Sequence, residues 1–198
     1  MSYIVISLLV FAFAGAQGAQ TDAIGSALGD GMQLVYASEG SEQVPWVYES
    51  IRVVERAEFD RCVIVTRRSQ AGRESCVRDG TLFEPDAAGT HVAVRPVGPR
   101  KELTVSTPAG NVLHYTTGEA TVRRVADRLD VPVIRTTVLT RDAKGAILRR
   151  LREDYAPSLL TAVWGIFEEP DGTGGWRAVR EFTLADVRSP SGPPTAPR

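Results

Sequence analysis

Between residues 32 and 188, the chain repeats one pattern: short runs rich in β-branched and aromatic residues, separated by turn-forming residues. Residues 102–107 and 111–117 flank a Pro-Ala-Gly turn, and residues 159–169 and 176–187 flank a turn that contains Asp-Gly. Such runs predict strands, and the glycine and proline residues between them predict tight turns. We therefore expect a mainly β domain: a curled antiparallel sheet or half-barrel of about ten strands, with one helix as an open alternative.

Two segments are compatible with either a helix or a strand. In residues 119–129, Val122, Val125 and Leu129 fall at positions i, i+3 and i+7, which is typical of one helix face, and a strand is equally well supported. Residues 146–155 are rich in Ala, Leu, Arg and Glu, which have good helix propensity. The Arg-Asp-Ala-Lys-Gly turn before them favours a returning strand, with a helix as the alternative.

The first 16 residues have the layout of a secretory signal peptide. Residues 3–14 are apolar apart from Ser7, and Ala14 and Ala16 occupy the −3 and −1 positions of an A-x-A cleavage site. The apolar run is shorter than the ~20 residues that cross a bilayer as a helix, so an uncleaved membrane anchor is less well supported. We therefore expect export to the periplasm or the outside of the cell, and a mature chain that is not an integral membrane protein.

The rest of the chain has the organisation of one domain with short flanking segments. We expect residues 1–16 to be the signal peptide, 17–31 a flexible lead-in, 32–188 a single β-rich domain, and 189–198 a disordered, proline-rich tail. The size of the central segment is usual for one domain. Arginine outnumbers lysine 21 to 2, a bias that indicates a bacterial source rather than any particular chemistry.

The two cysteines of the chain, Cys62 and Cys76, lie in a segment with the pattern of a hairpin. In an oxidising compartment two such cysteines tend to pair, and cross-strand neighbours lie within the separation that a disulfide accepts. A metal site is disfavoured because two cysteines lack the further ligands that zinc needs. A thioredoxin-type redox pair is disfavoured because C-x-x-C is absent. We expect a structural disulfide, with unpaired cysteines as the main alternative.

No motif in the sequence indicates an active site or a cofactor. Nucleophile-elbow, phosphate-loop and dinucleotide motifs are absent. Neither His91 nor His114 has a partner base or nucleophile that the sequence reveals, so we interpret both as structural or surface histidines. Glu168 and Glu169 precede Pro-Asp-Gly, and we interpret them as part of a solvated turn. We predict no catalytic residue, no metal and no cofactor, and we favour a non-enzymatic protein; an enzyme assembled from dispersed residues stays open.

The charge of the chain argues against one class of partner. The formal net charge is −1, so there is no excess of positive charge to follow a nucleic-acid backbone. We expect no nucleic-acid partner.

Aromatic residues on the expected strands supply the one indication of function. On the concave face of a curled sheet they could hold an acyl chain or another hydrophobic molecule, or they could form the core of the sheet. The predicted ligand-lining residues are Tyr36, Trp46, Tyr48, Trp164, Phe167 and Trp176. Our leading hypothesis is an exported, non-enzymatic binder or carrier of an apolar or lipidic molecule. The alternative is a cell-envelope module that binds a protein partner and has no ligand pocket.

Residues 128–157, RLDVPVIRTTVLTRDAKGAILRRLREDYAP, carry a family resemblance. A Val-Pro strand, a long hairpin and a strand that closes in Tyr-Ala-Pro resemble exported bacterial antiparallel β domains of unknown function, some of which are half-barrels like the periplasmic lipoprotein carriers. The chain departs from them at Val133 and Ile134, where a small residue is common, and it has no lipobox cysteine. The resemblance implies a half-barrel fold and carries over no functional residue.

Overall fold

The computed structural model describes residues 31–39, 46–67, 72–126 and 129–188. They form one antiparallel sheet of twelve strands. In chain order the strands are β1 (Gln33–Glu39), β2 (Trp46–Val54), β3 (Arg61–Arg67), β4 (Arg73–Arg78), β5 (Thr81–Pro85), β6 (His91–Pro96), β7 (Glu102–Ser106), β8 (Val112–Val125), β9 (Leu129–Arg141), β10 (Ile147–Ala156), β11 (Thr161–Pro170) and β12 (Trp176–Arg188).

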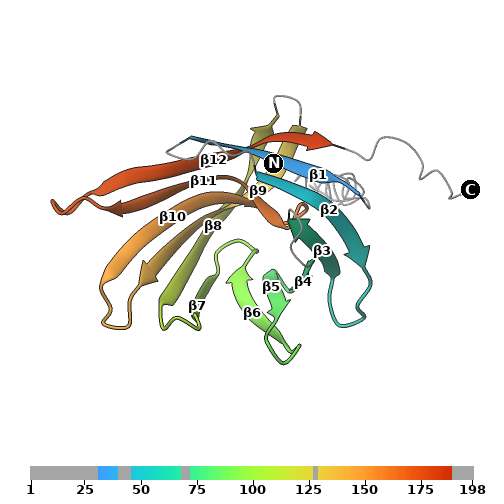
Figure 1. Ribbon diagram of the computed structural model, residues 1–198, viewed down its shortest axis with the longest axis horizontal. Coiled ribbons are helices and arrows are strands. Elements are labelled where there is room, and N and C mark those ends of the chain that lie inside the picture. The colour runs from blue at the N-terminus through green and yellow to red at the C-terminus, as the bar shows by residue number, and fades with distance from the viewer. Residues whose placement is uncertain (1–30, 40–45, 68–71, 127–128, 189–198) are drawn as a thin grey trace, which may run out of the picture.

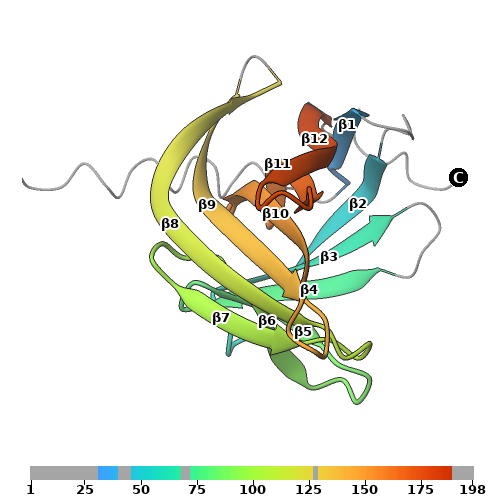
Figure 2. The same cartoon turned by 90° about the vertical axis from the view of Figure 1, so that its left-hand side faces the viewer.

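The sheet is a meander in which the first and last strands meet in the middle. The strand order is β6-β5-β4-β3-β2-β1-β12-β11-β10-β9-β8-β7. Gln33 of β1 lies opposite Arg188 of β12. The two edges are β6 and β7, which are not neighbours in any ladder. The sheet curls strongly, so that the arm ending in β6 and the arm ending in β7 face each other (Figure 1, Figure 2).

The expected curled antiparallel architecture is confirmed, and the strand number is corrected from about ten to twelve. The strands β5 and β6 escape sequence analysis because they are short and end at Pro85 and Pro96, and proline interrupts the pattern of a strand.

The open helix alternative is resolved in favour of strands, since the described residues contain no helix. Residues 119–125 belong to β8 and residues 147–156 to β10. The helical spacing in 119–129 is overridden by the antiparallel pairing of β8 with β9, in which Val125 pairs with Leu129 and Val122 with Pro132. Accordingly, that part of the chain has no helix of the length and apolarity needed to cross a membrane.

The loop of residues 97–101 connects the two edges of the sheet. The backbone N–H groups of Val97 and Gly98 donate to the carbonyl oxygen of Gly80, each at 2.9 Å. On the other side, the hydroxyl of Thr117 in β8 donates to the carbonyl oxygen of Gly98 and accepts from the N–H of Lys101, both at 2.7 Å. Side-chain and loop hydrogen bonds thus hold β6 near β7 in place of a ladder.

Two further segments contribute to the main hydrophobic cluster. The turn after β10 places Leu159 and Leu160 in the main hydrophobic cluster, and Arg61 Nη1 of β3 fixes it by donating to Ser158 O at 2.9 Å. At the far end of the β8–β9 hairpin, Val131 is fully buried in the same cluster. The expected signal peptide, the lead-in apart from Gly31, and the C-terminal tail all lie outside the described residues.

Candidate functional site: a cavity inside the curled sheet

A cavity of about 470 Å³ lies inside the curled sheet. Its walls come from both arms of the sheet, and a volume of this size is typical of small-molecule sites. Most lining side chains are apolar or aromatic. They are Leu34, Tyr36, Ile51, Val65, Arg73, Ser75, Leu82, Glu84, Val94, Arg95, Tyr115, Leu151, Glu153, Tyr155, Leu159, Leu160, Thr161, Ala162, Phe167 and Phe182.

One ion pair stands among these walls and joins the two arms. Arg95 Nη2 of β6 pairs with Glu153 Oε1 of β10, although the Glu153 side chain is only 3% exposed. The guanidinium carbon of Arg95 lies 4.2 Å from the ring centre of Tyr155 and 5.7 Å from that of Tyr115, in the range of cation–π contacts. Arg95 Nε is buried and finds no acceptor among the described residues. The wall therefore holds a cationic group with an N–H donor to spare.

A second ion pair marks the mouth of the cavity. Arg73 pairs with Glu84, and its side chain is 68% exposed while that of Glu84 is 18% exposed. Ser75 Oγ also donates to Glu84 Oε1, at 3.3 Å. The cavity therefore runs from a charged, solvated rim to a mainly apolar interior.

The tyrosine hydroxyls help to fix the cavity walls. Tyr36 Oη donates to Ala162 O at 2.9 Å and lies 2.9 Å from Thr161 Oγ1, which ties β1 to β11 across β12. Burial raises the pKa of Tyr115, partly offset by the charge of Arg95, so this hydroxyl is neutral at physiological pH.

The predicted ligand-lining aromatics are divided between two faces of the sheet. Tyr36 and Phe167 line the cavity. Trp164 lies on the outer face, where its Nε1 donates to Glu181, and Trp176 lies there too, with Arg150 4.2 Å above its ring centre. The side chains of Trp46 and Tyr48 lie outside the part of the structure that is described. A ligand-lining role for these residues stays a prediction.

Sequence reasoning missed several residues that the fold brings into the cavity. Phe182 and Tyr155 are aromatic residues on expected strands. Alternate residues of a strand point to the same face of the sheet, and this alternation was the signal that could have placed the two side chains in the cavity. Arg95 and Glu153 carried no such signal, because their pairing joins strands 58 residues apart.

The outer face of strands β10 and β11 holds two buried carboxylates, and arginine side chains neutralise both of them. Asp154 pairs with Arg123 and Arg135. Glu168 accepts hydrogen bonds from Arg150 Nε at 2.7 Å and from Arg152 Nε and Nη2, both at 2.9 Å. The interpretation of Glu168 as part of a solvated turn is therefore wrong, because β11 continues through this residue and turns its side chain onto the sheet.

These arginines decide the ionisation of Glu168. Burial raises the pKa of the Glu168 carboxyl, but the hydrogen bonds and charges of Arg150 and Arg152 together outweigh it, so the pKa lies below its usual value. The cluster is a fixed ion-pair network of the outer face and lies apart from the cavity.

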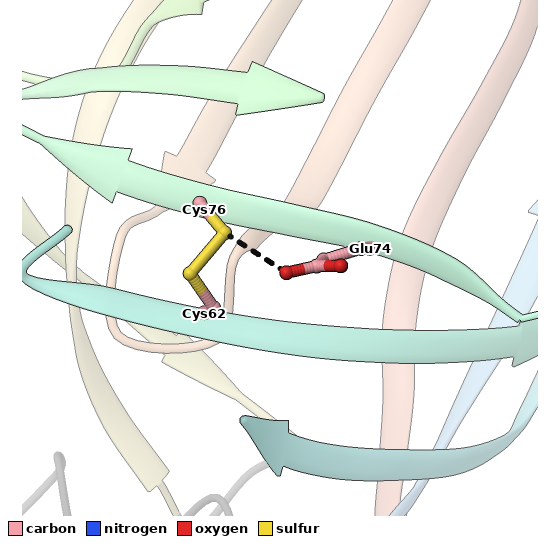
Figure 3. Close-up of side chains that lie close together, drawn as sticks. All are labelled: Cys62, Glu74 and Cys76. Atoms are coloured by element: carbon pink, nitrogen blue, oxygen red, sulfur yellow. Dashed lines mark hydrogen bonds between the residues drawn. A yellow bond between two sulfur atoms is a disulfide. The ribbon is translucent and has the colours of Figure 1, made fainter. Parts of the chain in front are cut away.

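The expected disulfide is present on the outer face of strands β3 and β4, in the arm of the sheet that ends in β6. Cys62 of β3 and Cys76 of β4 are direct cross-strand partners joined by a disulfide. Glu74 Oε1 lies 3.6 Å from Cys76 Sγ (Figure 3). His91 Nε2 lies 3.7 Å from the same sulfur. Sequence analysis did not bring His91 to the cysteines, because β6 and β4 are separated in the sheet by β5. Glu74 lies two residues before Cys76 on β4, so strand alternation was the signal that could have placed it there.

Comparisons with known proteins do not identify a family. The chain matches no protein-family model and no curated protein. Among solved structures, it is similar to a candidate lipoprotein from Parabacteroides distasonis, with 10% sequence identity and a TM-score of 0.45. That similarity covers 81% of this chain and 96% of the other.

Proposed function

We propose that the protein is an exported, non-enzymatic binder or carrier of an apolar or lipidic molecule, held in the cavity inside the curled sheet. One observation carries the proposal: a mainly apolar space of about 470 Å³ lies between the arms of the sheet, where a tightly packed core would leave no room. Export rests on the signal-peptide pattern of residues 1–16 and on the disulfide.

The charged groups of the cavity favour a ligand with an acidic head. Arg95 lines the cavity with its side chain 18% exposed, and Arg73 stands exposed at the rim. An amphiphile such as a long-chain fatty acid would bury its chain against the apolar walls and place its carboxylate near these guanidinium groups.

The surface gives less support to the alternative of a protein-binding module. Val53, Val92, Val122, Leu148 and Val179 are the exposed large hydrophobic side chains of the described residues. They lie on β2, β6, β8, β10 and β12, and no two of these strands are neighbours in the sheet. Single exposed residues of this kind do not mark a docking patch.

The first test is native mass spectrometry of the mature protein purified from its own cell envelope. We expect a mass that begins at Gln17 and a discrete lipid-like adduct, which organic extraction releases for identification. A protein that carries no adduct and takes up no added lipid would contradict the proposal.

A second test places the ligand in the cavity. Leu151 lines the cavity, and Leu148, on the same strand, is 44% exposed. We expect Leu151→Trp to weaken binding of the fluorescent fatty acid cis-parinaric acid at least tenfold, because the indole fills the space, and Leu148→Trp to leave binding unchanged. The methyl ester of the probe should bind more weakly than the acid if an arginine receives the head group. Equal binding by the two tryptophan variants would show that the ligand binds outside the cavity.

A further inference from the structure

Four side chains with the chemistry of zinc ligands meet on the outer face of β3–β6. Cys62 and Cys76 supply two sulfur atoms, Glu74 a carboxylate and His91 an imidazole. The donor atoms of Cys62, Cys76 and Glu74 all lie within 4.8 Å of one another. Two sulfurs, one nitrogen and one oxygen form a complete set of four ligands for a tetrahedral ion.

The spacing of these donors is close to what a tetrahedral ion requires. Cys76 Sγ lies 3.6 Å from Glu74 Oε1 and 3.7 Å from His91 Nε2, and the last two atoms are 3.8 Å apart. Zinc bonds of about 2.0 Å to nitrogen or oxygen and about 2.3 Å to sulfur give separations around a tetrahedron of roughly 3.3 Å between nitrogen and oxygen, roughly 3.5 Å from either of them to sulfur, and roughly 3.8 Å between two sulfurs. The two distances to sulfur fit these values, the oxygen and the nitrogen have to approach each other by about half an ångström, and the bond between the two sulfurs has to break before the site forms.

Neighbouring side chains hold Glu74 and His91 in place. Arg56 donates to both oxygens of Glu74, from Nε at 2.8 Å and from Nη2 at 3.2 Å, which holds the carboxylate in place. The Phe59 ring packs on His91 with its centre 4.9 Å from the imidazole. The cysteines are fully buried, while the side chains of Glu74 and His91 are 16% and 20% exposed and provide access from solvent.

We propose that reduction of the Cys62–Cys76 disulfide opens a binding site for a thiophilic divalent cation, zinc above all, with Cys62, Cys76, Glu74 and His91 as ligands. A dithiol or phosphine reductant supplies two electrons and breaks the S–S bond, two protons from the reductant or water complete the two thiols, and the reductant is oxidised. The cation then displaces both thiol protons and binds the two thiolates. Disulfide and metal are alternative closures of one hairpin, since the same sulfurs serve both. The site is independent of the cavity and of its proposed ligand.

The experiment uses the full mature chain, oxidised and after reduction with a phosphine, titrated with Co²⁺ without oxygen. We expect the reduced protein to bind one Co²⁺ with the visible bands of a tetrahedral ion and the near-ultraviolet charge-transfer band of cobalt thiolate, and Zn²⁺ to abolish both. The oxidised protein should show neither. Binding without these bands, or binding by the oxidised protein, would overturn the proposal.

Variants separate the four-ligand site from a pair of reduced thiols. We expect His91→Ala to weaken binding at least tenfold, and the matched change His114→Ala, which removes the histidine of β8, to have no effect. Glu74→Gln should also weaken binding. Unchanged affinity in both His91→Ala and Glu74→Gln would show that the ligand set is wrong.

A circular-dichroism control covers the case in which reduction alone unfolds the domain. Zn²⁺ should then restore the β spectrum of the reduced wild-type protein but not that of the Cys62→Ser/Cys76→Ser protein. Failure of the metal to restore the wild-type fold would overturn the proposal.

Discussion

At the scale of single residues, the ion pair between Arg95 and Glu153 places a buried charge in the cavity wall. Glu153 is 3% exposed, so it depends on Arg95 to balance its charge. Removing one partner of a buried pair leaves an uncompensated charge, whereas replacing both with apolar residues is far better tolerated.

We therefore predict that Arg95→Met lowers the free energy of unfolding by about 3–5 kcal/mol. The double variant Arg95→Met/Glu153→Leu should lose clearly less, because it leaves no lone carboxylate in the wall. Urea unfolding of the wild type and the two variants measures both values. Equal losses in the two variants would mean that Glu153 is hydrated and does not depend on Arg95.

Glu168 predicts a dependence of stability on acid. Its pKa is lowered in the folded protein, so the stability it contributes is complete above the ordinary carboxyl value of 4.5 and is lost as the pH falls through the lowered folded pKa. We expect the melting temperature of the wild type to fall in this range, and that of Glu168→Gln to start lower and fall less. The neighbouring Glu169 is 50% exposed, so Glu169→Gln should follow the wild type. A Glu168→Gln curve parallel to that of the wild type would contradict the assignment.

Single residues also show where sequence reasoning reaches its limit. Pairing of Cys62 with Cys76 could be predicted because both lie in one hairpin. Burial of Glu168 could not, because its two arginine partners lie on β10 and a Glu-Glu-Pro-Asp-Gly segment by itself resembles a turn. His91 could not be placed beside the cysteines without the order of strands, whereas strand alternation alone puts Glu74 on the same face of β4 as Cys76.

At the scale of elements, β11 and β12 are matched through a glycine that lies under an aromatic ring. Gly165 pairs with Phe182 across the two strands. A Cβ atom added at Gly165 would lie 2.5 Å from Cζ and 2.6 Å from Cε1 of Phe182, closer than atoms can approach. The ring lines the cavity, so its position couples the fit of the two strands to the cavity shape.

Gly165→Ala should therefore destabilise the protein by about 1–3 kcal/mol and weaken binding of the fatty-acid probe, because the Phe182 ring has to move toward the cavity. Gly118→Ala is the matched control in β8, since its added Cβ would meet nothing closer than 3.7 Å. Thermal unfolding and a probe titration measure the two effects. An unaffected Gly165→Ala protein would show that the ring shifts without resistance.

The pairing of strands that follow each other in the chain is the part of the fold that the sequence predicts well. Runs such as 102–107 and 111–117 alternate and are joined by tight turns, and they pair as β7 and β8. The pairing of β1 with β12 leaves no local trace, because it joins residues about 150 positions apart and is fixed only when the whole sheet is assembled.

At the scale of the whole molecule, the curl is held by the loop between β6 and β7. Thr117 is 4% exposed and connects that loop to β8 through two hydrogen bonds. Its loss would leave the Gly98 carbonyl and the Lys101 N–H without these partners. Both edges of the sheet would then be held less firmly.

We predict that Thr117→Val destabilises the protein by about 1–3 kcal/mol and raises amide hydrogen exchange in residues 97–101. Thr116→Val, at the exposed neighbouring position, is the control and should behave like the wild type. Hydrogen exchange with mass spectrometry reads out the loop directly. Faster exchange spread evenly over the sheet would argue against a local role for Thr117.

The cavity itself belongs to this scale. Its lining comes from strands along most of the chain, so the sequence could indicate a concave aromatic face but not the volume enclosed or the ion pair within it. Those depend on how tightly the two arms close, which is a property of the assembled sheet.

The strand order also bears on the covalent chain. Gln33 and Arg188 lie side by side, and the gap in the ladders falls between β6 and β7, which follow each other in the sequence. Joining Arg188 to Gln33 with a short linker and cutting within residues 97–101 would keep every ladder and run from β7 through to β6 as a plain up-and-down meander. The strand order is thus a circular permutation of the simplest antiparallel topology, in which each strand pairs with the next one along the chain.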